Sequence, residues 1–150
     1  MASHRAAGSA PELGPYAPAF TATCYPPSPR HLAAARRFAL RTAHEWGLAA
    51  VADAAVCVVS ELMANAIAAV SPAPGGAPEP PGAVWLSLAR PRDGLLCVVH
   101  DPATSGGPAP SRPGPGEESG RGLLIVAALS EEWGWHRDQG TTVWARIRCP

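Results

Sequence analysis

Apolar residues recur at helical spacing in two stretches of this 150-residue chain. In the first stretch, from about Pro29 to Trp46, apolar positions return at every third or fourth residue. Ser28 stands at the cap position and Gly47 directly follows the stretch, which are typical start and stop signals of a helix. The second stretch, residues 51–70, carries a continuous apolar stripe. The pattern therefore predicts two long helices in succession.

Strand patterns and loop-forming segments fill the rest of the chain. Segments rich in Gly, Pro and Ser predict a flexible tail at 1–18 and loops at 71–82 and 102–119. The other predicted elements are an edge strand at 20–25, hairpins that pair 84–89 with 95–99 and 133–137 with 142–148, and a short helix at 122–129. This order predicts one α+β domain over residues 19–149, a two-layer sandwich with helices on one face of a mixed, mostly antiparallel sheet.

The second predicted helix carries a pair of polar residues on one side. Glu61 and Asn65 are four residues apart and point away from the apolar stripe. Their side of the helix is otherwise nearly all alanine, whereas a solvated face ordinarily carries Arg and Glu. An Asn carbonyl oxygen suits Mg²⁺, and a nearby carboxylate can orient or deprotonate a hydroxyl. The alternative is a structural pair in which Glu61 bridges to an Arg of the first helix.

Composition narrows the classes of chemistry. The twelve basic residues, all Arg, balance twelve acidic ones, so the footprint of a nucleic-acid-binding protein is missing. Without lysine, a Walker A loop and Schiff-base chemistry are excluded. The four cysteines lack zinc spacing, and Cys57 and Cys97 are predicted to be small buried hydrophobes. Because neither a signal peptide nor an apolar run of about 18 residues is apparent, we expect a cytoplasmic protein without a membrane span.

Two further features lie downstream of the polar pair. Asp101 follows an apolar strand, where an ionised carboxylate can accept the exocyclic amine of adenine; a turn Asp before Pro102 is an equal alternative. Gly120 and Gly122 open the third predicted helix, where free N–H groups and the helix dipole attract phosphate. Arg121 between them could add positive charge or point into solvent. In this order the features predict a nucleotide site that is not a P-loop.

Other side chains that often carry chemistry are interpreted as structural. His100 and His136 have no partner at metal spacing. The strand tryptophans alternate along their strands and are suited to packing in the core and on the sheet faces: Trp85, Trp133, Trp135 and Trp144.

Taken together, these motifs resemble those of the histidine-kinase-like ATPases, the GHKL or Bergerat group, and within it the anti-sigma-factor serine/threonine kinases. The similarity covers about residues 19–148. Residues 59–66, Val-Ser-Glu-Leu-Met-Ala-Asn-Ala, are similar to the N-box, and Asp101 lies at the position of the first glycine-box aspartate. Residues 120–124, Gly-Arg-Gly-Leu-Leu, are similar to the second glycine box. Residues 140–144, Gly-Thr-Thr-Val-Trp, resemble the closing strand motif.

The resemblance implies the Bergerat ATP-binding fold, with ATP and Mg²⁺ as ligands. Asn65 would hold Mg²⁺, Glu61 would be the general base and Asp101 would read adenine. Thr142 would support the adenine site, and the loop 102–119 would be a lid. The implied nucleotide-binding set is completed by the second glycine box, Gly120, Arg121, Gly122 and Leu123.

Members of this group transfer the γ-phosphate of ATP to a serine of an anti-anti-sigma partner and sequester a sigma factor, so the resemblance implies a transcription regulator with such partners. A homodimer is left open. Two parts of the sequence depart from the family pattern. Ala68 and Ala69 occupy positions where the family often has a basic pair, and Pro102-Ala103 follows Asp101 where the superfamily has Gly two residues on. They leave open the alternative of a catalytically weak or inactive nucleotide-binding module that regulates through protein–protein interaction.

Overall fold

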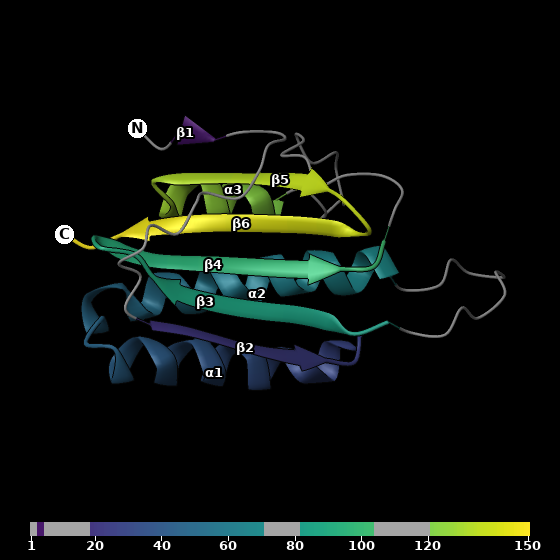
Figure 1. Cartoon of the computed structure of the whole chain (residues 1–150), viewed down its shortest axis with the longest axis horizontal. Helices are drawn as coiled ribbons and strands as arrows, with labels where there is room; N and C mark the ends of the chain where they lie inside the picture. The colour runs from purple at the N-terminus through teal and green to yellow at the C-terminus, as the bar shows by residue number, and fades with distance from the viewer. Residues whose placement is uncertain (1–2, 5–18, 71–81, 104–120) are drawn as a thin grey trace, which may run out of the picture.

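A computed structural model describes residues 3–4, 19–70, 82–103 and 121–150 of the chain. Within these ranges a six-stranded sheet forms one layer, and the α-helices form a second layer on one of its faces (Figure 1). The elements in chain order are β1 (Ser3–His4), β2 (Ala19–Tyr25), the 3-10 turn η1 (Pro29–His31), α1 (Leu32–Glu45), the 3-10 turn η2 (Ala49–Val51), α2 (Ala52–Val70), β3 (Val84–Arg90), β4 (Gly94–Asp101), α3 (Arg121–Leu129), β5 (Glu132–Arg137) and β6 (Thr141–Arg148).

The sheet has the strand order β1-β5-β6-β4-β3-β2. All neighbouring pairs are antiparallel except β1, which runs parallel to β5. The predicted α+β sandwich with a mixed, mostly antiparallel sheet is therefore confirmed, and so is the edge position of β2. Strand β1 is an addition, because it lies in the segment that the sequence predicts as a tail. Two residues are too few to reveal a strand by alternation.

The predicted end of the first helix is confirmed, whereas at its start Pro29–His31 form the 3-10 turn η1 and the α-helix begins at Leu32. Ser28 has the extended backbone of a cap residue, at φ −135° and ψ 139°, but its side chain makes no capping hydrogen bond. A 3-10 turn leads into α1. At the other end, Gly47 adopts φ +73° and the N–H of Leu48 donates to the carbonyl of Ala43 at 2.7 Å. This left-handed glycine ends the helix as its position in the sequence predicts.

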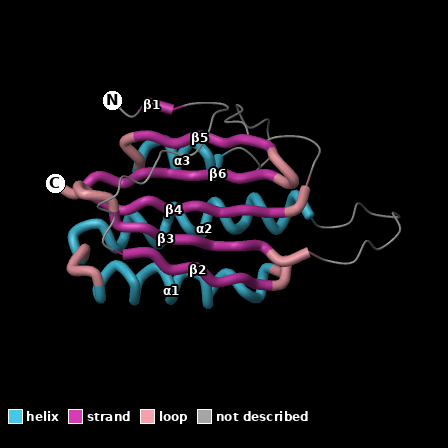
Figure 2. The backbone as a smooth tube through the Cα atoms, viewed as in Figure 1, coloured by secondary structure: helices cyan, strands magenta, loops and turns pink. Residues whose placement is uncertain are grey.

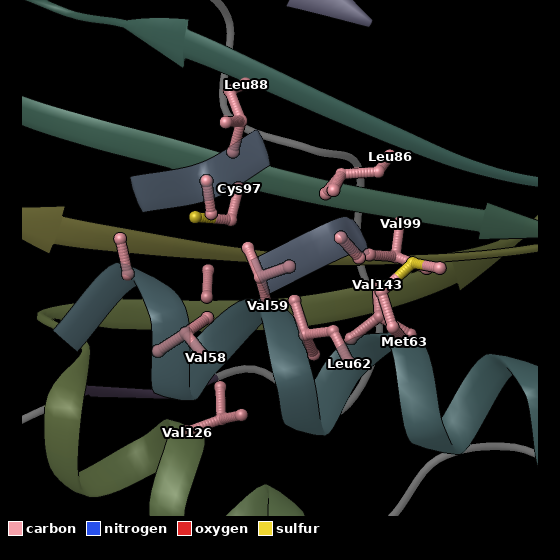
Figure 3. Close-up of a cluster of buried hydrophobic side chains, with 14 of the residues drawn as sticks. Val58, Val59, Leu62, Met63, Leu86, Leu88, Cys97, Val99, Val126 and Val143 are labelled. Carbon is pink, nitrogen blue, oxygen red and sulfur yellow. The ribbon is translucent and has the colours of Figure 1, made fainter. Parts of the chain in front are cut away.

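The hydrophobic core lies between the sheet and the helices. Leu86, Leu88 and Val99 of the sheet belong to one buried cluster with Val59 and Met63 of α2 (Figure 3). Alternation along each strand assigns these residues to the helix side. Among the described residues, the opposite side of the sheet bears no helix (Figure 2), and we call it the outer face. Because of this alternation, adjacent residues at a strand end serve different faces.

Helix α2 is central to this core. By length and composition alone, the segment Ala49–Val70 is apolar enough to cross a membrane. In the structure it packs against the sheet and against α1 and α3, and half of its most apolar stretch is buried. The polar residues Ser60, Glu61 and Asn65 interrupt it, and the helix is nevertheless long and apolar enough on average to meet the criterion for a span, which is not expected from the sequence pattern. The composition is that of a core helix in a folded domain.

The two cysteines predicted to be buried have different environments. Cys97 of β4 is fully buried in the core, and burial raises the pKa of its thiol to about 12. Cys57 is exposed on α2, so the prediction of a buried hydrophobe is wrong for this residue. It lies one turn before Glu61 on the same side of the helix, which the core does not cover.

Candidate functional site

Asp101 ends β4 and is almost completely buried, with 3% of its surface exposed. Its Oδ1 accepts a hydrogen bond from the N–H of Ala103 at 2.8 Å, so the turn-forming alternative suggested by the sequence is present. Burial raises the pKa of the Asp101 carboxyl, while the Ala103 N–H and the charges of His100 and Arg137 act in the opposite direction. Within the described residues this bond engages Oδ1.

A second residue, Thr141, completes this end of the site. It lies directly opposite Asp101 in the register of β4 with β6 and is also buried. Its hydroxyl donates to the carbonyl of Ala103 at 2.8 Å. Ala103 is therefore held through both its N–H and its carbonyl. The sequence does not single out Thr141, because only the strand register reveals which of two adjacent threonines shares a face with Asp101.

The adjacent Thr142 points to the outer face. Its Oγ1 lies 2.9 Å from Nδ1 of His100, the neighbour of Asp101 on the other side of the sheet. The resemblance implies that Thr142 supports the adenine site, and this role stays a prediction. The two-residue period of a strand assigns Thr141 and Thr142 to opposite faces, so of the two it is Thr141 that shares a face with Asp101.

Glu61 and Asn65 lie one turn apart on α2, and both are half-buried. The structural alternative for Glu61 is a bridge to an Arg of the first helix. The Arg of α1 that reaches this part of α2 is Arg36, and its guanidinium donates to Oγ of Ser60 at 3.2 Å. The arginine thus engages the residue before Glu61.

Gly122 lies in the first turn of α3, directly against Glu61. A Cβ placed on Gly122 would overlap Oε2 of Glu61 and would lie 3.5 Å from the Glu61 Cβ. Any side chain larger than hydrogen would therefore displace either the carboxylate or the helix start. The structure brings these two predicted site residues, which are far apart in the sequence, into direct contact.

The core holds the two parts of the site near each other. Met63, two residues before Asn65, lies in one buried cluster with Val99, two residues before Asp101, and with Val143 of β6 (Figure 3). The last turns of α2 and the C-terminal end of β4 also lie at the same end of the molecule, on the right in Figure 1. The helix turn that bears Asn65 is thereby fixed beside the strand ends that bear Asp101 and its partners.

Several predicted features lie outside the described residues. These are most of the predicted tail, Gly120, the side chain of Arg121, and the predicted lid from residue 104 onward. Leu123, the last member of the second glycine box in the predicted set, packs into the core. Its side chain therefore anchors the start of α3 and its backbone alone is left for a ligand.

The two departures from the family pattern have different surroundings. Pro102 packs against Gly82, where an added Cβ would lie 2.7 Å from the Pro102 Cγ. Ala68 and Ala69 are exposed near the end of α2 and add no charge there. The proline departure is accommodated by the fold, whereas the alanines leave a surface without the usual basic pair.

The donor set suits a cation that is shared with phosphate. In residues 3–4, 19–70, 82–103 and 121–150, no group of three or more His, Cys, Asp or Glu side chains could hold a metal ion by itself. Mg²⁺ typically keeps several waters and takes substrate phosphates together with one or two protein oxygens. The amide oxygen of Asn65 could serve as one of these protein oxygens.

Comparison with known proteins agrees with this arrangement. A family model described as a histidine kinase-like ATPase domain matches residues 25–147, which covers both parts of the site and every element from the end of β2 to β6. A comparison with curated protein sequences finds no significant match. Because the family match spans most of the chain and the fold agrees with it, this chain belongs to the histidine kinase-like ATPase family.

Proposed function

We propose that this ATP-binding regulatory domain is a cytoplasmic serine/threonine kinase that phosphorylates a serine of an anti-anti-sigma-type partner. Family membership supports the ATP-binding part of this proposal. The observation that carries the kinase part is the contact between the Glu61 carboxylate and Gly122 at the start of α3. It joins a candidate base to a candidate phosphate-binding helix start.

Adenine recognition is assigned to the strand ends. Oδ2 of Asp101 would accept a hydrogen bond from the exocyclic amine of adenine. Oδ1 is held by Ala103, and Thr141 holds Ala103 in turn, so the orientation of the carboxylate is set before a ligand arrives. A base with a carbonyl oxygen in place of that amine would face the carboxylate with an acceptor, which disfavours it.

The triphosphate is assigned to the opposite part of the site. Gly122 leaves space for close approach to the backbone at the start of α3, and Gly120 and Arg121 precede it in the chain. Asn65 would contribute its amide oxygen to Mg²⁺. When bound, the cation would neutralise charge on the phosphates and orient them.

The transfer step is assigned to Glu61. Its carboxylate would accept the proton of the partner's serine hydroxyl while the serine oxygen bonds to the γ-phosphorus. The bond between that phosphorus and the bridging β–γ oxygen breaks, and ADP leaves with the electron pair. The carboxylate is half-buried and packed against Gly122, so its position is limited by packing on one side.

A second candidate function is a nucleotide-dependent binding module without turnover. The uncharged, exposed Ala68 and Ala69 favour it, because they replace the basic pair that the family often has at these positions. In this case the chain would still bind ATP through Asp101 and Gly122. It would regulate a sigma factor or its antagonist by association alone.

The test is phosphate transfer from γ-labelled ATP to a co-encoded anti-anti-sigma-type protein in the presence of Mg²⁺. We expect label on one serine of that partner. Two controls should remove the label: a partner in which that serine is replaced by Ala, and the Asp101→Ala kinase, which lacks the adenine acceptor. Nucleotide binding by the wild type without label on any co-encoded partner would favour the binding module.

A further inference from the structure

The outer face of the sheet carries a polar pair directly behind the candidate adenine site. Nδ1 of His100 and Oγ1 of Thr142 are 2.9 Å apart, and the two residues are direct cross-strand partners on β4 and β6. The preceding outer-face pair in the same register is apolar, Val98 with Trp144. An apolar pair would also hold two strands together, so strand pairing alone does not account for the hydrogen bond.

The imidazole of His100 also packs against the turn between β5 and β6. Gly140 ends this turn with φ +125°, a conformation that favours glycine. A Cβ on Gly140 would overlap the backbone carbonyl oxygen of Asp101 and would lie 2.9 Å from both Cε1 and Nε2 of His100. The backbone of Gly140 is therefore packed between Asp101 and the ring. The hydrogen bond to Thr142 orients the ring in that position.

A series of neighbouring contacts links these residues to Asp101 on the inner face of the sheet. Gly140 precedes Thr141, whose hydroxyl donates to the carbonyl of Ala103. The N–H of Ala103 donates in turn to Oδ1 of Asp101. The path from the ring of His100 to the carboxylate thus runs through one packed backbone position and two hydrogen bonds of 2.8 Å.

We propose that His100 and Thr142 are positioning residues for base selectivity, although neither touches the nucleotide. The inference rests on the proposed role of Asp101 in reading adenine. The bond between His100 and Thr142 holds the ring against Gly140, and the ring holds Thr141 in register with Asp101. Loss of the bond lets the carboxylate leave the direction of the adenine amine, without altering the contacts assigned to the triphosphate.

The experiment compares the dissociation constants of Mg-ATP and Mg-ITP. ITP carries a carbonyl oxygen where ATP has the amine, and its triphosphate is the same. Thr142→Val removes the hydrogen bond at nearly constant volume, and His100→Phe removes it while keeping a ring against Gly140. Thr142→Ser restores the hydroxyl. His136→Phe is the matched control, since His136 is the cross-strand partner of Thr142 on the other side.

We expect the wild type to prefer ATP by roughly 10-fold or more, the scale of a hydrogen bond to a charged group. Thr142→Val and His100→Phe should each reduce that preference by about 3- to 10-fold, the scale of one hydrogen bond, with little change in ITP affinity. The double variant should lose no more than either single one, because both remove the same bond. Thr142→Ser and His136→Phe should keep the wild-type preference.

Three results would overturn the inference, and they are distinguishable. An undiminished ATP preference in Thr142→Val would show that the bond does not position Asp101. Parallel weakening of ATP and ITP would indicate general loss of structure. Equal binding of ATP and ITP by the wild type would remove the adenine role of Asp101 on which the inference rests. Failure of phosphate transfer, by contrast, would defeat the kinase proposal and leave this binding test intact.

Discussion

The two ends of the candidate site are constructed differently. At the base end, Asp101, Ala103 and Thr141 are joined by hydrogen bonds, and the carboxylate is buried. At the phosphate end, Glu61 and Gly122 meet through a close contact, in which a Cβ at position 122 would require the Glu61 carboxylate to move. A hydrogen-bonded, buried group is oriented before the ligand binds, and this favours selectivity. We therefore expect variants at the base end to alter nucleotide choice and variants at the phosphate end to alter transfer.

The largest effect is expected for Glu61→Gln at the phosphate end. The amide keeps the shape of the side chain and removes its basicity, so transfer to the partner should fall by roughly 10²–10⁴-fold. ATP affinity should stay close to that of the wild type, because base and triphosphate contacts are intact. Single-turnover transfer and calorimetric binding measure the two quantities separately. An unchanged transfer rate would refute the base role.

The next effect concerns Asn65 and the cation. Asn65→Ala removes the proposed oxygen ligand, so the gain in ATP affinity on adding Mg²⁺ should shrink by roughly 10- to 100-fold, the scale of damaged metal sites. Asn65→Asp is the matched control because it retains an oxygen at that position. Titrations with Mg²⁺ and with a chelator give the gain for each protein. A full Mg²⁺ effect in the alanine variant would exclude Asn65 as ligand.

A smaller effect is expected for the contact itself. Gly122→Ala places a Cβ on the Glu61 carboxylate, which is the end of a flexible side chain and can shift. The free energy of unfolding should therefore fall by about 1 kcal/mol, the low end of what overpacking costs. In a Glu61→Ala background the same change should cost almost nothing, because the overlapping atoms are absent. Urea unfolding of the four proteins measures this coupling. An equal loss of stability in both backgrounds would mean that the contact with Glu61 does not cause the cost of a side chain at position 122.

The smallest effect is a pH dependence at the base end. Burial raises the pKa of Asp101 from its ordinary value of 3.8, so the protonated form is favoured on folding. The stability from this shift is fully present below 3.8 and is lost as pH rises through the raised pKa. The Asp101→Asn variant has no carboxyl group to titrate, so it does not lose stability in this way as pH rises. Its amide oxygen can still accept the hydrogen bond from the Ala103 N–H.

Without nucleotide, the free energy of unfolding of Asp101→Asn should therefore rise relative to the wild type as pH increases from about 3 to 7. Chemical unfolding at several pH values gives this difference. A difference that stays constant or falls over that range would contradict a buried carboxylate with a raised pKa.

Almost all of the helices and strands can be predicted from the sequence, because each has a clear hydrophobic period and clear end signals. The helix start at Ser28, the stop at Gly47 and the hairpin turn before Gly94 all lie where composition predicts them. The two-residue strand β1 has no such signal. It exists only through its parallel pairing with β5, which is a long-range contact.

The candidate site was only partly accessible from the sequence. Spacing on one helix is a local property, so Glu61 and Asn65 can be paired from the sequence alone. The choice between Thr141 and Thr142 is not local, since a shift of one residue in strand register exchanges their faces. The exposure of Cys57 is not predictable for a related reason: an apolar neighbourhood in the sequence does not show which side of a helix the core covers.

The most direct test of the central claim is a calorimetric titration of the wild-type chain with Mg-ATP and with Mg-GTP. Asp101 can accept the amine of adenine, whereas guanine presents a carbonyl oxygen at the same position. We expect saturable ATP binding that is tighter than GTP binding by one to two decades, or about 1.5–3 kcal/mol. Equal binding of the two nucleotides, or no binding of ATP, would contradict it.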